Sequence, residues 1–122
     1  MKVLVIDDSR AMRMLLGQML LQMGFEVSEA RHGREALTYL EANRDVGLAL
    51  VDWNMPEMNG IEFVEAVRKD ERFASLQLMM VTTETEMARV ARAMEAGAQE
   101  YVMKPFTRDV LDGKLRLMGL LG

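Results

Sequence analysis

Five short, mostly apolar runs alternate with five segments of helical periodicity, and this alternation constrains the fold more than any other feature. Continuous apolar runs are typical of strands buried on both faces of a sheet, whereas alternation of polar and apolar residues indicates a strand nearer an edge. Strict strand–helix alternation predicts a parallel sheet with helices on both faces, joined by right-handed crossovers. Five units are too few for an eight-stranded barrel, so we expect an α/β fold with an open doubly wound sheet. The expected strands are KVLVI (2–6), FEVSEA (25–30, the edge strand), LALV (48–51), LQLMMV (76–81) and EYVM (100–103).

Capping residues and glycines indicate where the helices begin and end. Asn59 with Glu62 three residues later resembles a capping box, and so does TETE (83–86). Glycine is favoured just after a helix because it adopts a positive φ without strain. Five helices are expected. The first lies between Ser9 and Gly24, the second spans about 33–43, the third begins after Asn59, the fourth runs from TETE (83–86) to Gly97, and the fifth runs from Thr107 to about 118.

Size and composition exclude several classes of protein. The 122 residues suit one domain, which we expect to span 1–122, and the net charge is −4 without a basic stripe, which argues against direct nucleic-acid binding. The chain has no cysteine and one histidine, His32, so thiolate chemistry and a histidine-based zinc site are excluded. The start MKVLVIDD is no signal peptide, and no apolar run is long enough to cross a membrane. We therefore expect a soluble cytoplasmic protein.

Polar side chains directly follow four of the five expected strands. Asp7 and Asp8 follow the first, Asp52 the third, Thr82 the fourth and Lys104 the fifth. In open α/β sheets, ligands bind outside the carboxyl ends of the strands, where the strand order reverses. If the strands are parallel, three carboxylates, a hydroxyl and an ammonium therefore share one crevice.

This combination of groups suits phosphoryl transfer with a metal ion. Clustered carboxylates repel one another unless a cation is bound, and carboxylate oxygens suit a hard ion such as Mg²⁺. Lys104 and Thr82 would hold phosphoryl oxygens, and a carboxylate can itself be the nucleophile that forms an aspartyl phosphate. We expect Asp52 to attack, while Asp7 and Asp8 hold the metal with the backbone carbonyl of Asn54.

Each of these residues also has an ordinary structural explanation. A lone Asp52 after a strand is usually a turn residue or a helix cap, and an acidic pair such as Asp7 and Asp8 favours a helix N-terminus. A lone threonine there is most often a cap, and a lone lysine a solvated charge. Their joint placement at four strand ends favours a site.

The motifs resemble those of the response-regulator receiver domain of two-component signalling. VLVIDDSR, LALVDWNMPEMNG, LMMVTTE and GAQEYVMKPF fit that family in order and spacing over the whole chain, most closely its stand-alone chemotaxis type. The resemblance implies a flavodoxin-like sheet with strand order 2-1-3-4-5 and five helices. It also implies a phosphoprotein that takes a phosphoryl group from a histidine kinase or phosphotransfer protein, with only slow autodephosphorylation and no enzymatic turnover.

The resemblance assigns roles at the site. Asp52 would be the phosphoacceptor, and Asp8, Asp52 and the Asn54 carbonyl would ligate Mg²⁺ directly, with Asp7 bound through water. Lys104 would bridge to the phosphoryl oxygens, and the Lys104–Pro105 bond would be cis.

The resemblance also assigns switch and tuning residues. Thr82 would move to bond a phosphoryl oxygen, and Tyr101 would swing inward, changing the face made by the strand 100–103 and the last two helices, where a downstream protein binds. Asn54 and Glu84 would tune the phosphoryl lifetime. Trp53 beside the acceptor would report metal and phosphoryl state through fluorescence.

Two other functions remain open on the sequence. The chain could be the receiver part of a transcription factor or signalling enzyme whose output domain is absent. It could also be a Mg²⁺-dependent phosphohydrolase, although the haloacid-dehalogenase type has a second acid where this chain has Asn54.

The last helix carries Gly113 and an apolar end, LRLMGLLG, which could dock on the domain, form a dimer or mark a cut inside a longer protein. We expect a monomer or weak dimer.

Overall fold

Five parallel strands form one sheet within residues 1–121, which the computed structural model describes apart from the side chain of Glu84. The strand order is β2-β1-β3-β4-β5, and every neighbouring pair is parallel, which confirms the predicted flavodoxin-like fold. The strands are β1 (Lys2–Ile6), β2 (Glu26–Ala30), β3 (Val46–Asp52), β4 (Gln77–Thr82) and β5 (Glu100–Met103). The helices are α1 (Arg10–Gln22), α2 (Gly33–Ala42), α3 (Gly60–Arg68), α4 (Val90–Ala96) and α5 (Arg108–Leu117), with 3₁₀ turns η1 (Glu71–Phe73) and η2 (Glu84–Arg89).

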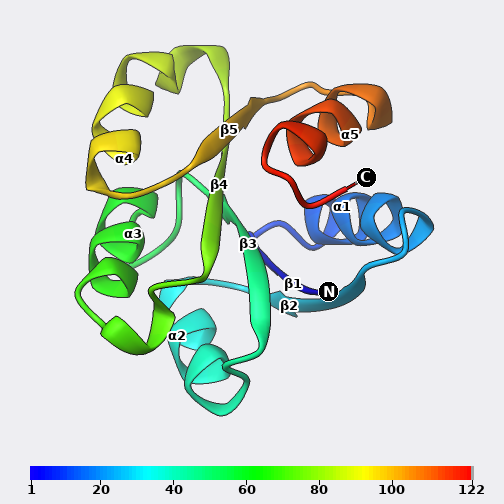
Figure 1. Ribbon diagram of the computed structural model, residues 1–122. Helices are drawn as coiled ribbons and strands as arrows, with labels where there is room; N and C mark the ends of the chain where they lie inside the picture. The colour runs from blue at the N-terminus through cyan, green and yellow to red at the C-terminus, as the bar shows by residue number, and fades with distance from the viewer. Residues whose placement is uncertain (122) are drawn as a thin grey trace.

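Helices cover both faces of the sheet (Figure 1). α1 and α5 lie on one face, and α2, α3 and α4 lie on the other. Each face has its own apolar layer: Leu16, Leu111 and Leu115 belong to the first, and Leu40 and Phe63 to the second. The central strands are therefore buried on both sides, as their continuous apolar runs predict.

The helix ends follow the expected capping chemistry. Ser9 and Thr107 accept hydrogen bonds from the third residue of α1 and α5, and Asn59 forms a capping box with Glu62. Gly24, at φ +98°, follows the end of α1, as the sequence indicates. His32 caps α2 through its ring nitrogen, a role that histidine rarely has and that we did not predict.

The structure differs from the expected boundaries in three places. β3 begins at Val46, two residues before the expected start. Lys2 pairs with Val46 and Val3 pairs with Leu48, so Gly47 lies in a bulge between the two pairs. The helix expected between TETE and Gly97 is divided into the 3₁₀ turn η2 and the short α4, and the turn η1 was not predicted. Among the described residues, no helix is long and apolar enough to cross a membrane.

Candidate functional site

The carboxyl ends of four strands meet at one edge of the sheet and bring the expected polar residues together. Asp52 and Thr82 are the last residues of β3 and β4, while Asp7 and Lys104 directly follow β1 and β5. β1 and β3 are neighbours in the sheet, with β2 on the other side of β1, so the strand order reverses between them. These residues therefore lie where ligands bind in this fold class.

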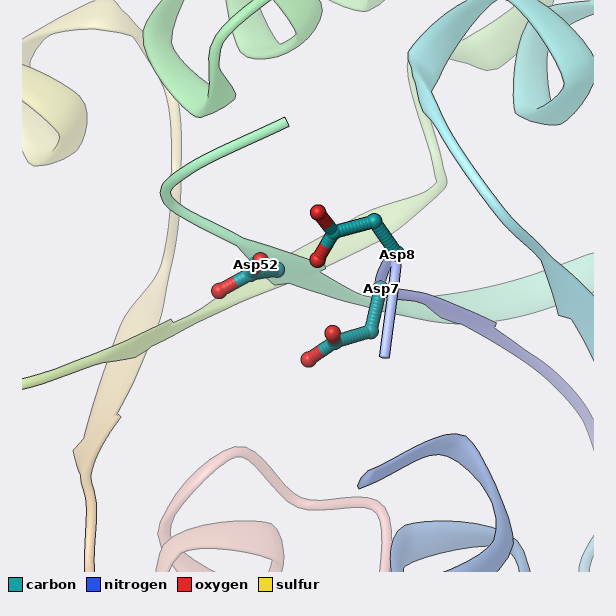
Figure 2. A group of neighbouring side chains, drawn as sticks. All are labelled: Asp7, Asp8 and Asp52. Atoms are coloured by element: carbon teal, nitrogen blue, oxygen red, sulfur yellow. The ribbon is translucent and has the colours of Figure 1, made fainter. Parts of the chain in front are cut away.

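Three carboxylates form a tight group at this edge (Figure 2). One oxygen each of Asp7, Asp8 and Asp52 lies within 4.8 Å of the others. Asp7 and Asp52 are buried, while Asp8 is exposed at the mouth. Such proximity is electrostatically unfavourable without a compensating cation.

Asp7 has one satisfied and one unsatisfied oxygen. Its Oδ1 accepts a hydrogen bond of 2.8 Å from the backbone N–H of Ser9, which holds the acidic turn against the start of α1. Its buried Oδ2 accepts no hydrogen bond from any described residue, and the nearest cation is Lys104 Nζ at 3.6 Å. A buried carboxylate oxygen without a donor is costly, which indicates room for a further positive partner.

The carboxyl group of Asp52 is held in an environment that disfavours its charge. Burial, and next the negative charge of Asp7, raise its pKa to about 6, with a smaller contribution from Asp8. Lys104 opposes this shift, because its Nζ lies 3.4 Å from Asp52 Oδ1. The lysine is therefore the one ammonium within ion-pair distance of both buried aspartates among the described residues.

The donor set fits a hard divalent cation. All the clustered ligands are oxygens, two are buried, and one of these lacks a hydrogen-bond donor. Carboxylates with few other protein ligands are typical of Mg²⁺, which keeps several waters. The residues present therefore fit the magnesium ion expected from the sequence.

Thr82 and Lys104 are fixed by local backbone structure. The buried Thr82 donates its hydroxyl to the carbonyl oxygen of Thr83 at 3.3 Å, so it faces its own loop. The Lys104 N–H donates to the Thr82 carbonyl at 2.6 Å, and the Lys104–Pro105 peptide bond is cis. This backbone bond thus joins Thr82 at the end of β4 to the residue that follows β5.

Of the two expected tuning residues, only Asn54 has a described side chain. Asn54 is exposed just beyond β3, and its amide Nδ2 donates to Glu86 Oε2 at 2.7 Å. The backbone of Glu84 begins η2, but its side chain lies outside the described part of the chain.

The expected switch and reporter aromatics lie on different elements. Tyr101 is half-buried on β5, with Lys114 Nζ of α5 4.1 Å from its ring centroid and Glu100 paired to that lysine at 3.2 Å. Trp53, next to Asp52, is 2% exposed and lies 5.9 Å from the guanidinium of Arg89. Trp53 therefore borders the site, whereas Tyr101 lies on the surface made by β5 and α5.

Sequence reasoning missed two residues that organise the site. Arg13 donates to the backbone carbonyl of Asp7 at 2.7 Å and to Glu29 at 2.9 Å, which fixes the acidic turn. Glu86 accepts from Asn54, although the sequence indicated only a cap. Neither contact has a sequence signal, because neither helical periodicity nor a capping pattern indicates a side chain of α1 bonded to the turn after β1 or a side chain of η2 bonded to Asn54.

An open doubly wound sheet with an acidic pocket and a lysine at its carboxyl edge defines a receiver-type α/β domain. Residues 3–116 match the family model described as "Response regulator receiver domain", so the chain belongs to that family. Receiver domains belong to two-component systems, so the chain is a signalling protein.

Individual relatives extend this likeness to almost the full chain. The chain is 47% identical to chemotaxis protein CheY1 of Helicobacter pylori, covering 97% of this chain and 96% of that protein. It is also 47% identical to a CheY homolog of Campylobacter jejuni, over 94% and 89%. The structure of chemotaxis protein CheY4 of Vibrio cholerae superposes with a TM-score of 0.87 at 36% identity, covering 95% and 96%. A response regulator/GGDEF domain protein superposes at 0.91 with 33% identity, but this chain covers only 50% of it.

Proposed function

We propose that residues 1–122 form one receiver domain that works as a phosphorylation switch of the stand-alone chemotaxis type. The observation that carries the proposal is the Lys104 ammonium between the buried carboxylates of Asp7 and Asp52. The similarity to chemotaxis proteins over nearly their full length supports this output. The phosphoryl donor is a histidine kinase or a phosphotransfer protein, and the setting is the cytoplasm.

Asp52 is the phosphoacceptor. One of its carboxylate oxygens attacks the phosphorus of the donor phosphohistidine, a P–O bond forms, and the P–N bond breaks, with the electron pair leaving on the histidine nitrogen. Lys104, 3.4 Å from Asp52 Oδ1, offsets the negative charge that accumulates around the phosphoryl group. Thr82 turns its hydroxyl from the Thr83 carbonyl towards a phosphoryl oxygen.

Mg²⁺ is the cofactor, held by Asp8, Asp52 and the carbonyl of Asn54, with Asp7 bound through water. The bound ion supplies positive charge that neutralises the clustered carboxylates and the phosphoryl oxygens. The orphaned oxygen of Asp7 supports this assignment. The protein residues themselves position the acceptor and exclude solvent from its buried side.

The output is a change of one protein-binding surface. Movement of Thr82 is coupled to movement of Tyr101, which changes the face made by α4, β5 and α5. A downstream protein binds this face. The switch works because that protein has different affinities for the two conformations. Self-catalysed dephosphorylation is slow, and Asn54 and Glu84 tune its rate. The domain binds its partners as a monomer or weak dimer, with no direct contact to nucleic acid or membrane.

One observation favours a second candidate. The response regulator/GGDEF relative carries a similar domain within a chain about twice as long. A receiver regulating a fused output domain is therefore the alternative, with the same chemistry at Asp52.

Fluorescence of Trp53 tests the proposed site. It is the protein's one tryptophan, is buried, and adjoins Asp52. We expect its emission to change on addition of Mg²⁺ and again on addition of acetyl phosphate. Asp52→Asn should abolish the second change. An unchanged donor response in this variant would refute Asp52 as the acceptor.

A further inference from the structure

Glu86 joins two loops that flank the site. It lies in η2 and is 7% exposed, an unusual position for a carboxylate. Its two oxygens have separate partners. Oε1 accepts from the backbone N–H and the hydroxyl of Thr83 at 2.9 and 2.8 Å, whereas Oε2 accepts from Asn54 Nδ2 at 2.7 Å. The first set caps η2, and the second has no capping function.

The bond to Glu86 determines which way the Asn54 amide faces. An ionised carboxylate only accepts hydrogen bonds, so it must face the NH₂ end of the amide. The carbonyl end, Oδ1, is therefore turned away from Glu86. Because Asn54 lies two residues beyond Asp52 and is exposed, its free end is available to water at the mouth of the site.

We propose that Glu86 is a positioning residue that sets the phosphoryl lifetime, because it turns the side-chain carbonyl Oδ1 of Asn54 towards the hydrolytic water. The inference rests on the proposed function of Asp52. A water that attacks phosphorus uses its oxygen lone pair, so an acceptor that holds its hydrogen assists attack. An NH₂ group would instead bind that lone pair and hinder the attack. Glu86 thus favours hydrolysis through the orientation of a neighbour.

Glu86→Gln separates this role from capping. Glutamine keeps an acceptor for Thr83, since Gln serves as well as Glu in a capping box. The Thr83 N–H cannot accept a hydrogen bond, so the glutamine NH₂ must face Asn54. The Asn54 amide then turns to offer Oδ1, which leaves its NH₂ end free. The cap is retained while the polarity of Asn54 is reversed.

The test is the rate of phosphate loss after loading with acetyl phosphate and Mg²⁺ and removal of the donor, followed by intact mass. We expect Glu86→Gln to slow dephosphorylation by about threefold or more, with a melting temperature within about 2 °C of wild type. Glu62→Gln is the matched control, because Glu62 caps α3 in the same way without contacting Asn54. Its dephosphorylation rate should be that of wild type.

The Asn54→Ala background decides whether Glu86 acts through Asn54. We expect Asn54→Ala and Asn54→Ala/Glu86→Gln to lose phosphate at the same rate, whereas a general effect of the missing charge would persist in the double variant and overturn the inference. A wild-type rate in Glu86→Gln would also overturn it and leave Glu86 as a cap.

Two controls separate the inference from the proposed function. If wild type gains no phosphoryl group in the mass spectrum, the proposed function fails and the inference fails with it. If loading is normal, only the inference is judged by the variants. The side-chain amide NMR signal of Asn54 gives a readout without phosphorylation: it should shift in Glu86→Gln but not in Glu62→Gln, and an unchanged signal would contradict the reorientation.

Discussion

At the scale of single residues, the environment of Asp52 favours binding of a cation but lowers the folding stability of the metal-free protein. Its carboxylate is buried beside Asp7, and Lys104 offsets only part of that unfavourable charge. Sequence reasoning placed the three groups together because each follows a buried strand. It could not predict the raised pKa, which depends on burial and on distances between strands.

Replacing the charge should therefore stabilise the metal-free protein. We expect Asp52→Asn to raise the free energy of unfolding by about 1–2 kcal/mol at pH 7, discounted for solvent reaching the carboxylate. The folded-state pKa of about 6 lies above the ordinary value of 3.8, so ionisation opposes folding. The gain should shrink as pH falls through 6, because the folded wild type then takes up the proton, and disappear below about 4. Urea unfolding at several pH values with chelator present measures it.

Asp45→Asn serves as the control for this prediction. Asp45 is an exposed aspartate whose pKa Lys2 lowers through a hydrogen bond, so its removal should bring no gain in stability. A loss of stability in Asp52→Asn at pH 7 without metal would contradict the account of a strained carboxylate.

At the scale of elements, Arg68 fastens the end of α3 to three other segments. Its guanidinium donates to the backbone carbonyls of Phe73, Leu76 and Gly97 at 3.2, 2.7 and 3.0 Å. It also donates to Gln99 Oε1 at 3.0 Å. These bonds hold η1, the start of β4 and the end of α4 in place, and no periodicity in the sequence indicates them.

Lysine cannot replace this arginine, because a single ammonium lacks the planar set of donors. We expect Arg68→Lys to lower the free energy of unfolding by about 2 kcal/mol, since buried carbonyls lose charge-assisted hydrogen bonds. Chemical denaturation measures the loss. Arg34→Lys is the control, because the Arg34 side chain is exposed and its ion pair to Glu57 is 3.9 Å long. Equal stability of the two variants would show that the Arg68 network contributes nothing.

The helices and strands differ in how far sequence predicts them. Ser9, Asn59 and Thr107 cap their helices as expected, because capping depends on residues three apart. The start of β3 was missed because Gly47 lies in a bulge, and bulges depend on the partner strand. The division of the segment after Thr83 into η2 and α4 has no signal in its apolar pattern.

At the scale of the whole molecule, the parallel sheet converts residues distant in sequence into one site. Polar groups after four strands meet because all four strands end at the same edge (Figure 1). The strand–helix alternation predicts the parallel sheet and hence the position of the site, whereas the strand order was predicted only through the resemblance to the receiver family. Side-chain contacts such as Arg13 to Asp7 and Glu86 to Asn54 become visible only in three dimensions.

The central claim is that a phosphoryl group is carried by Asp52 itself. Borohydride reduces an aspartyl phosphate to homoserine, which marks the acceptor permanently. We would load the protein with acetyl phosphate and Mg²⁺, reduce it, and locate homoserine by peptide mass spectrometry. Homoserine at residue 52 alone, absent when Mg²⁺ is chelated, is the predicted result. Homoserine at Asp7 or Asp8 instead, or none in a folded protein, would contradict the account.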